Sequence, residues 1–234
     1  MKFAPEGYPF IFGSLLFSGI AAVLLWWVLK NATSTLVISL TLLLWGLSFI
    51  LTFFMAFFFR DPDRIIPGGA GLFVSPADGK VIGIKDVAEK TYLDADAKEI
   101  SIFMSPLDVH VNRAPCDGKV ITVQYSPGKY MAAYKDDASL KNENIVMVLD
   151  SGEGKVLVRQ VAGFVARRAV CRAKEGDVLK RGEKYGIIKF SSRLDVYLPK
   201  DAEIKVKLGD RVKAGESVIA VLSSKKADSA QKFL

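Results

Sequence analysis

Two long stretches without a charged side chain stand near the start of the chain, and short alternating runs follow them. Residues 8–29 and 35–59 contain no Asp, Glu, Lys or Arg. Each stretch is longer than the roughly 20 apolar residues that a helix needs to cross the hydrocarbon core of a bilayer. Only residues 30–34 separate them, which is enough for a turn. We therefore predict two transmembrane helices, at about residues 8–29 and 35–59, that form a hairpin with both ends on one side.

The residues flanking these stretches favour membrane helices over a signal peptide and set their orientation. A signal peptide has an apolar region of about 7 to 15 residues that ends in small residues, whereas the first stretch is longer and ends in two tryptophans. Three basic residues flank the open end of the hairpin: Lys2, Arg60 and Arg64. Its turn contains one, Lys30. The positive-inside rule therefore predicts a protein of the cell membrane whose main domain is cytoplasmic.

After residue 59 the pattern changes from continuous apolar residues to short runs in which apolar and polar residues alternate. Runs such as KVIGIKD, EISIFM and RLDVYLP have strand length, repeat with period two and are rich in Val, Ile, Phe and Tyr. Gly and Pro separate many of these runs. We predict a membrane hairpin at residues 1–64 and a mostly β domain at residues 65–234.

Two pairs of internal repeats stand within the β domain. PADGKV at 76–81 returns as PCDGKV at 115–120, and GDVLKRGE at 176–183 returns as GDRVKAGE at 209–216. The second pair resembles the turns of lipoyl and biotinyl carrier domains, in which glycines supply the positive φ that the turn requires. We therefore expect lipoyl/biotinyl-like β units. A carrier would also need a modifiable lysine at a hairpin tip, and neither repeat presents one in a recognisable setting.

The net charge favours some binding partners over others, and the two cysteines indicate whether the chain has disulfides or a metal site. The formal net charge is +7, of which residues 1–60 contribute +2 (Lys2, Lys30 and Arg60 against Glu6) and residues 61–234 contribute +5. A basic domain tethered to a bilayer is expected to lie against an anionic membrane surface. The chain has no arginine-rich run, recognition-helix pattern or zinc-finger pattern, which argues against nucleic acid. The two cysteines, Cys116 and Cys171, lack metal-ligand spacing and disulfide density, so we predict reduced core residues and no metal site.

The chain contains a single histidine, His110, within MSPLDVHVNRAP. A lone histidine on a strand is more often structural than catalytic. Here His110 alternates with Asp108, and Pro106 and Pro115 bracket the segment, which predicts a short edge or active-site strand with both side chains on one face. His110 is therefore a candidate base.

Asp78 and the serine pair Ser191–Ser192 also have plain structural interpretations. Asp78 begins an Asp-Gly turn dipeptide that recurs at Asp117, and two serines can form a polar bend between strands. A serine becomes a nucleophile when a neighbouring base takes its proton. Spacing along the chain leaves open whether Ser192, His110 and Asp78 meet.

Five motifs, in order along the chain, resemble the short form of phosphatidylserine decarboxylase. They are FRDPDR (59–64), SPADGKV (75–81), MSPLDVHVNRAP (104–115), QVAGFVARR (160–168) and FSSRLDVYLP (190–199). The resemblance runs from the hairpin to about residue 199. It implies a pyruvoyl-dependent enzyme that converts phosphatidylserine to phosphatidylethanolamine and carbon dioxide, after the proenzyme cuts itself before a serine.

On this chain the resemblance implies that the serine is Ser192. Its hydroxyl would attack the carbonyl of residue 191, and elimination with hydrolysis would leave a pyruvoyl group on an α chain of residues 192–234, separate from a β chain of residues 1–191. A ketone conjugated with an amide is the electron sink that decarboxylation of an amino acid needs. His110 would reprotonate the carbanion, and Asp78 would orient or charge-stabilise the histidine during cleavage.

The chain departs from the family pattern in two places. The family usually has Gly-Ser at the cleavage bond, and here Ser191 takes the place of glycine. Because a residue with a Cβ resists strained turns, we expect slowed or blocked processing, or a slightly different turn. Longer relatives carry a second histidine where this chain has Arg113, so we expect His110 to serve both cleavage and turnover.

The resemblance also implies partners. Phosphatidylserine is the expected substrate, the α and β chains of one precursor are expected to stay together, and a homodimer is possible. Candidates for binding the lipid phosphate or substrate carboxylate are Arg113, Arg167, Arg168 and Arg193, although a solvated basic face explains any one of them equally well. The alternative is a membrane-tethered lipoyl-like carrier or adaptor without enzymatic activity; an adaptor would usually have long helical segments, which the β domain lacks.

Overall fold

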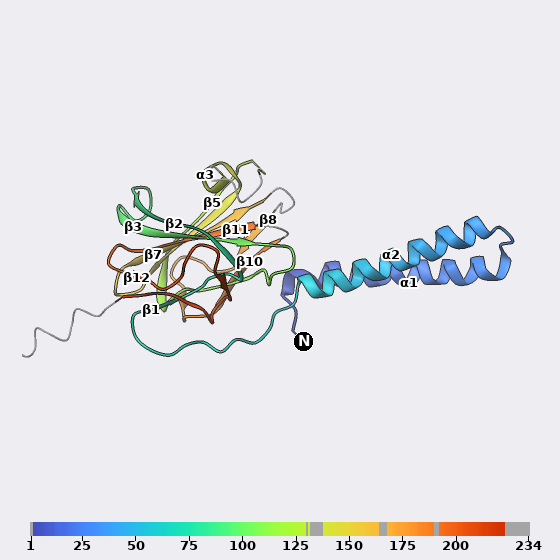
Figure 1. Ribbon diagram of the computed structural model, residues 1–234, viewed down its shortest axis with the longest axis horizontal. Helices are drawn as coiled ribbons and strands as arrows, with labels where there is room; N and C mark the ends of the chain where they lie inside the picture. Colours follow the sequence, from blue (N-terminus) through green and yellow to red (C-terminus); the bar gives the residue numbers. More distant parts are fainter. Residues whose placement is uncertain (1, 130, 132–137, 164–167, 190–191, 223–234) are drawn as a thin grey trace, which may run out of the picture. The chain divides into compact units, whose positions relative to one another are not determined.

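The computed structural model describes residues 2–129, 131, 138–163, 168–189 and 192–222. The chain forms two compact units, Met1–Pro62 and Asp63–Leu234. The first unit holds two long helices, and the second is built mainly of strands (Figure 1).

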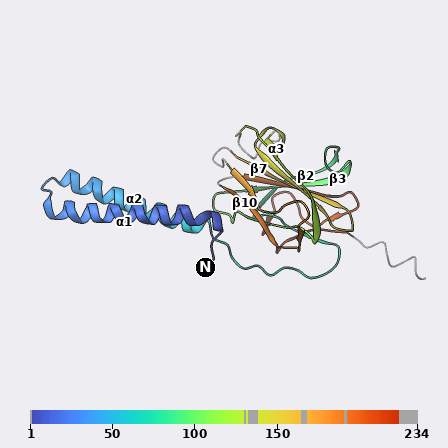
Figure 2. The same ribbon diagram turned by 180° about the vertical axis from the view of Figure 1, so that it is seen from behind.

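The first unit is a hairpin of α1 (Tyr8–Asn31) and α2 (Thr35–Phe58), preceded by the short 3-10 helix η1 (Pro5–Gly7). The two helices lie side by side in both views (Figures 1 and 2). The N–H of Ala4 donates to the carbonyl of Phe59 at 2.9 Å, so the two ends of the unit meet. Both helices are long and apolar enough to span a membrane. The predicted pair of helices is confirmed, with α1 extending two residues beyond its predicted end.

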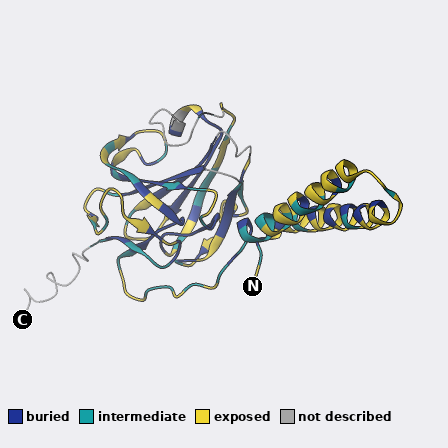
Figure 3. Cartoon of the chain, turned by 45° about the vertical axis from the view of Figure 1, so that its right-hand side comes forward, coloured by how far each residue is buried: buried dark blue, intermediate teal, exposed yellow. Residues whose placement is uncertain are grey.

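A stripe of mostly small residues lets α1 pack against α2. The buried residues of α1 recur at spacings of four and three: Ser14, Ser18, Ala21, Leu25 and Val28. Small side chains at this spacing allow two apolar helices to approach closely without a hydrophobic driving force between them. Most of the large apolar side chains of both helices face outward and are exposed (Figure 3), as expected of surfaces that lipid covers.

The second unit is mostly β, as predicted. Among the described residues its strands are β1 (Leu72–Val74), β2 (Gly79–Glu89), β3 (Ala95–Met104), β4 (Val111–Arg113), β5 (Gly118–Ser126), β6 (Asn144–Asp150), β7 (Lys155–Ala162), β8 (Arg168–Cys171), β9 (Val178–Leu179), β10 (Lys184–Lys189), β11 (Ser192–Pro199), β12 (Glu203–Ile204), β13 (Arg211–Val212) and β14 (Val218–Val221), with the short helix α3 (Ala138–Lys141). An eight-stranded sheet has the order β13-β2-β3-β11-β7-β6-β5-β9, and two three-stranded sheets have the orders β1-β14-β12 and β4-β10-β8.

Strand β11 lies inside the eight-stranded sheet, antiparallel to β3 on one side and to β7 on the other. Side chains alternate between the two faces of a strand. Leu194, Val196 and Leu198 therefore share the face that packs into the main hydrophobic core, to which all three sheets contribute. Arg193 and Asp195 point to the opposite face. One face of β11 is therefore mainly apolar, and the other carries charged side chains.

The internal repeats have matching backbone conformations. Gly176 and Gly209 both have φ +94°, and Gly182 and Gly215 both have φ +77°. The strand within each repeat also pairs equivalently, because β9 pairs with the start of β5 and β13 pairs with the start of β2. The predicted requirement for positive φ is confirmed at these four glycines, and the two repeats are structurally equivalent.

Candidate active site

Ser192 is the first residue of β11 and is fully buried. Its Oγ lies 3.4 Å from the Sδ of Met104, its neighbour on β3. The same sulfur lies 3.9 Å from the Nδ2 of Asn112 on β4. The hydroxyl therefore faces the segment that carries the histidine. Ser191, the other residue of the predicted cleavage site, lies outside the described residues.

His110 ends a turn between β3 and β4. The expectation that His110 and Asp108 share a strand face is wrong, because residues 105–110 form a turn rather than a strand. The N–H of Asp108 donates to the carbonyl of Ser105, and the N–H of Ser105 donates to Asp108 Oδ2, both at 2.9 Å. These bonds replace the ladder bonds that a strand would make, and Pro106 has no N–H to offer a ladder. The short edge strand is confirmed as β4, which begins directly after His110.

The ring of His110 has a defined orientation. The side chain is fully buried, and its Nδ1 lies 2.9 Å from the carbonyl oxygen of Asp108. A carbonyl oxygen only accepts hydrogen bonds, so we assign the hydrogen to Nδ1, and Nε2 is the ring atom that can take a proton. The N–H of Ile188 donates to the carbonyl of His110 at 3.4 Å. This contact places the histidine beside the end of β10, shortly before Ser192 in the chain.

Asp78 lies in the turn that precedes β2, and its carboxylate is held on both oxygens. Arg64 Nη2 lies 3.0 Å from Oδ1 and 2.8 Å from Oδ2, and the N–H of Ala214 donates to Oδ1 at 2.7 Å. Burial raises the pKa of Asp78, while the Ala214 N–H and the Arg64 guanidinium oppose that rise. The negative charge of Asp108 adds to it. The carboxylate of Asp108 itself pairs with Arg211 at 3.2 Å, while its carbonyl orients His110.

The second repeat contains an equivalent of Asp78. The N–H of Arg181 donates to Asp117 Oδ1 at 2.9 Å, in the way that the N–H of Ala214 donates to Asp78. The guanidinium of Arg181, however, binds backbone carbonyls instead of the Asp117 carboxylate. Both aspartates thus bind a backbone N–H of a distant GDxxKxGE repeat, Ala214 for Asp78 and Arg181 for Asp117. What distinguishes Asp78 is its ion pair with Arg64.

Breaking this ion pair is expected to cost about 3 kcal/mol of stability at neutral pH, because Arg64→Gln leaves a buried carboxylate without its cation. The exposed fractions of the two side chains are 6% for Arg64 and 13% for Asp78. The pKa of Asp78 is raised already, so losing the cation raises it further. The loss should therefore shrink as the pH falls and Asp78 becomes protonated.

Thermal unfolding of the full chain in detergent, in a Ser192→Ala background that would remove the predicted cleavage, measures this loss. The matched control is Lys200→Gln, which breaks an ion pair with Asp96 whose side chains are 67% and 58% exposed. That pair should contribute less than about 1 kcal/mol. Equal losses in the two variants would contradict the assignment of a buried, stabilising pair at Asp78.

The predicted arginines occupy different surroundings. Arg113 is buried, and its Nη1 donates to the carbonyl of Gly182 at 2.9 Å. Arg193 is buried on the face of β11 opposite to Ser192. Arg168 is exposed at the start of β8, and Arg167 lies outside the described residues. The structure therefore places the Ser192 hydroxyl against Met104, the residue before the histidine turn, and places Arg193 on the opposite face of β11.

Sequence reasoning missed three residues near the site. Arg64 was considered only as a charge beside the membrane, although it ends the FRDPDR motif. Asn112 and Gln160 were not considered, and the Nε2 of Gln160 donates to the Oδ1 of Asn112 at 2.8 Å in the interior. Gln160 begins the QVAGFVARR motif, and Asn112 lies within MSPLDVHVNRAP. Membership of a family-like motif was the available signal in both cases.

The cysteines do not supply a rival nucleophile. Cys116 and Cys171 are both free, as predicted. Cys116 is in the core, and burial raises the pKa of its thiol to about 12. Cys171 is half-buried against the core, and burial also raises the pKa of its thiol. Because the thiolate is the reactive form, both residues are poor nucleophiles at neutral pH.

The second unit is a mostly β domain, and the unit that precedes it holds two helices long and apolar enough to span a membrane. The family described as phosphatidylserine decarboxylase matches residues 51–220. The chain therefore belongs to the phosphatidylserine decarboxylase family, which confirms the resemblance of the five motifs.

Two of the relatives match over nearly the whole chain, and a third matches over 71% of it. The phosphatidylserine decarboxylase proenzyme of Geotalea uraniireducens is 43% identical over 220 residues, which cover 94% of this chain and 96% of that protein. The proenzyme of Magnetococcus marinus is 41% identical over 225 residues, covering 96% and 97%. That of Syntrophus aciditrophicus is 47% identical over 167 residues, covering 71% and 78%.

Proposed function

We propose that this chain is a membrane-anchored proenzyme that cuts itself between residues 191 and 192 and then converts phosphatidylserine to phosphatidylethanolamine and carbon dioxide. Family membership and the proenzyme names of the relatives support this function. The observation that links this function to one residue is the buried hydroxyl of Ser192, at the start of β11 and in contact with Met104, the first residue of the motif that contains the histidine.

In the cleavage step, Ser192 Oγ attacks the carbonyl carbon of residue 191 while His110 Nε2 takes its proton. The C–N bond breaks, the nitrogen takes a proton, and an ester joins residue 191 to Oγ. Loss of a proton from Cα of residue 192 then breaks the Cβ–O bond and frees the β chain as a carboxylate. Water hydrolyses the remaining enamine, releases ammonia and leaves a pyruvoyl group. Asp78, held by Arg64, provides a fixed negative charge near the histidine turn.

The surroundings of Ser192 are compatible with a chemical role for its hydroxyl. Within the described part of the chain, the hydroxyl makes its hydrogen bond to the sulfur of Met104, a weak acceptor. A buried hydroxyl with so weak a partner contributes little to stability and suits a chemical role. A pyruvoyl group supplies an electron sink for the loss of carbon dioxide. His110 Nε2 would deliver the proton that replaces the carboxylate on the substrate.

We propose that the hairpin holds the β domain at the cytoplasmic face of the cell membrane. The formal charge of +5 on residues 61–234 supports contact with anionic lipid. Among the described arginines that the sequence indicated, Arg168 is exposed and is our candidate for the lipid phosphate. The equivalence of the two repeats supports related, lipoyl-like β units.

An intact-mass spectrum of the purified full chain under denaturing conditions tests this function. We expect two fragments, with the smaller one beginning at residue 192 and carrying a pyruvoyl group in place of serine. Ser191→Gly is expected to speed cleavage about tenfold, because a Cβ in a strained turn costs on the order of 1–2 kcal/mol.

A single intact chain would show that Ser191 blocks maturation, provided that Ser191→Gly restores cleavage. If the glycine variant also stayed intact, self-cleavage would have to be abandoned.

A further inference from the structure

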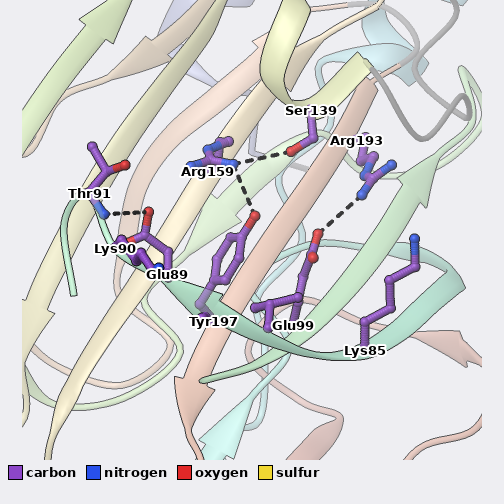
Figure 4. Close-up of a pocket in the computed structure, with 11 residues that line it drawn as sticks. Lys85, Glu89, Lys90, Thr91, Glu99, Ser139, Arg159, Arg193 and Tyr197 are labelled. Atoms are coloured by element: carbon purple, nitrogen blue, oxygen red, sulfur yellow. Dashed lines mark hydrogen bonds and ion pairs between the residues drawn. The ribbon is translucent and has the colours of Figure 1, made fainter. Parts of the chain in front are cut away.

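The face of β11 opposite to Ser192 carries a buried group of charged and polar side chains. Arg193 Nε lies 2.5 Å from Asp195 Oδ1, and Arg193 Nη2 lies 3.2 Å from Glu99 Oε1 and 2.8 Å from Ser101 Oγ. The exposed fractions of Arg193, Asp195 and Glu99 are 4%, 0% and 9%. We call these four residues the clamp. Figure 4 shows Arg193 and Glu99 pointing toward each other across neighbouring strands.

The clamp continues onto β7 and α3. Ser139 Oγ donates to Asp195 Oδ2 at 2.6 Å. Arg159 Nη1 donates to the hydroxyl of Tyr197 at 3.0 Å, as Figure 4 shows. Glu99 and Arg193 also line a cavity of about 390 Å³ on this face. The polar contacts of β11 thus reach partners on both neighbouring strands.

Cleavage between residues 191 and 192 would divide this group between two chains. Arg193, Asp195 and Tyr197 would belong to the α chain, and Glu99, Ser101, Ser139 and Arg159 would belong to the β chain. We propose that the clamp holds the new N-terminus of the α chain in place after cleavage, with Arg193 as its positioning residue. This inference rests on the proposed self-cleavage.

The physical need for a clamp follows from where the break falls. Before cleavage, residue 192 is tied covalently on both sides. Afterwards it is a chain end, and chain ends fray unless they are held. A slip of one residue would turn every side chain of β11 to the wrong face of the sheet. Arg193 is the first side chain after the reactive end, and its ion pair with Glu99 resists both changes.

An ordinary buried ion pair would stabilise the chain equally before and after cleavage, whereas the clamp should contribute more once the chain is cut. We therefore compare Glu99→Gln with Asp96→Asn. Asp96 pairs with Lys200 at 2.7 Å, so it also joins β3 to the α-chain side of the break, but at the far end of β11 and in solvent. Glu99→Gln is expected to cleave fully and to lose about 10- to 100-fold in kcat with little change in KM, because small misplacements of a reacting group cost this much. Asp96→Asn should change neither.

The melting temperature provides a second measurement. Glu99→Gln should lower it more in the cleaved protein than in the uncleavable Ser192→Ala background. Should Glu99→Gln prevent folding, Ser101→Ala removes one contact of Arg193 and should give a smaller loss in the same direction. If Glu99→Gln lowered the melting temperature equally in both backgrounds and left kcat unchanged, the clamp proposal would be wrong and the proposed function would still stand. A wild-type chain that stays uncut in the mass spectrum would overturn the proposed function and the clamp together.

The clamp also predicts a pH dependence of turnover. The groups that act on Glu99 are Asp195 and Arg193 from β11, Ser101 from β3 and Lys85 from β2. The other charged or titratable residues that line the same cavity are Glu89 from β2, Lys90, Arg159 from β7 and Tyr197 from β11. Burial, and then the charge of Asp195, raise the pKa of Glu99 above its ordinary value. As the pH falls through this raised pKa, Glu99 becomes neutral and its ion pair with Arg193 is lost. The kcat of the wild type should then fall, and Glu99→Gln should lack this acidic limb.

Discussion

Replacing Ser192 with alanine is expected to leave one uncut chain that makes no measurable phosphatidylethanolamine. Without Oγ there is no nucleophile for cleavage, and without cleavage there is no electron sink for decarboxylation. Turnover should fall to the uncatalysed rate, at least about 10⁶-fold below the parent, the lower end of enzymatic rate enhancements. Alanine fits the fully buried site that serine occupies, so folding should be retained.

Intact mass and lipid analysis of the same preparation measure the two losses together. The matched variant is Ser191→Ala, which keeps the hydroxyl of Ser192 and should cleave at about the parent rate. If Ser192→Ala cleaved and Ser191→Ala did not, Ser191 would be the nucleophile. If Ser192→Ala stayed intact but retained turnover, the pyruvoyl chemistry would be wrong.

Replacing His110 should also remove both cleavage and turnover, because the chain has no second histidine to divide the two tasks. General acid–base catalysis by a positioned side chain contributes about 10²- to 10⁴-fold to each step. Cleavage of His110→Ala should therefore slow by that factor. Chains that do cut after long incubation should still turn over slowly, because the proton donor is missing.

A second variant separates the chemistry of His110 from its place in the fold. His110→Asn can keep a hydrogen bond from its side-chain nitrogen to the carbonyl of Asp108, which Nδ1 makes in the parent at 2.9 Å, but it has no counterpart of Nε2. It should fold as the parent does and still fail to cleave. Cleavage of His110→Asn at the parent rate would contradict the proposal that one histidine serves as the base for both steps.

The hairpin and the repeated turns were predictable because their causes are local. A helix satisfies its own backbone hydrogen bonds, so an uncharged run of sufficient length identifies it without knowledge of its neighbours. The positive φ of the repeat glycines was also predictable, because it is a property of a single residue. Gly176 and Gly209 share it. The family was recognisable for a related reason, because its motifs are short and contiguous.

The histidine segment shows where a local pattern misleads. Alternation of Asp108 and His110 indicated a strand, but the Asp108 carboxylate bonds the backbone of Ser105 and makes a turn instead. Alternation describes a strand only when the ladder bonds are free to form. Here the Asp108 side chain accepts a hydrogen bond from the backbone N–H of Ser105, which a ladder would otherwise use.

The sequence by itself determined the hairpin of two apolar helices, the mostly β domain and the family to which the chain belongs. Only the tertiary structure decided that Asp78 is paired with Arg64, that the Ser192 hydroxyl lies against Met104, and that Arg193 lies on the opposite side of β11 against Glu99. Arg193 and Glu99 are 94 positions apart in the sequence. Residues so distant meet only through the register of β3 against β11, which depends on how the whole sheet pairs and not on any segment alone.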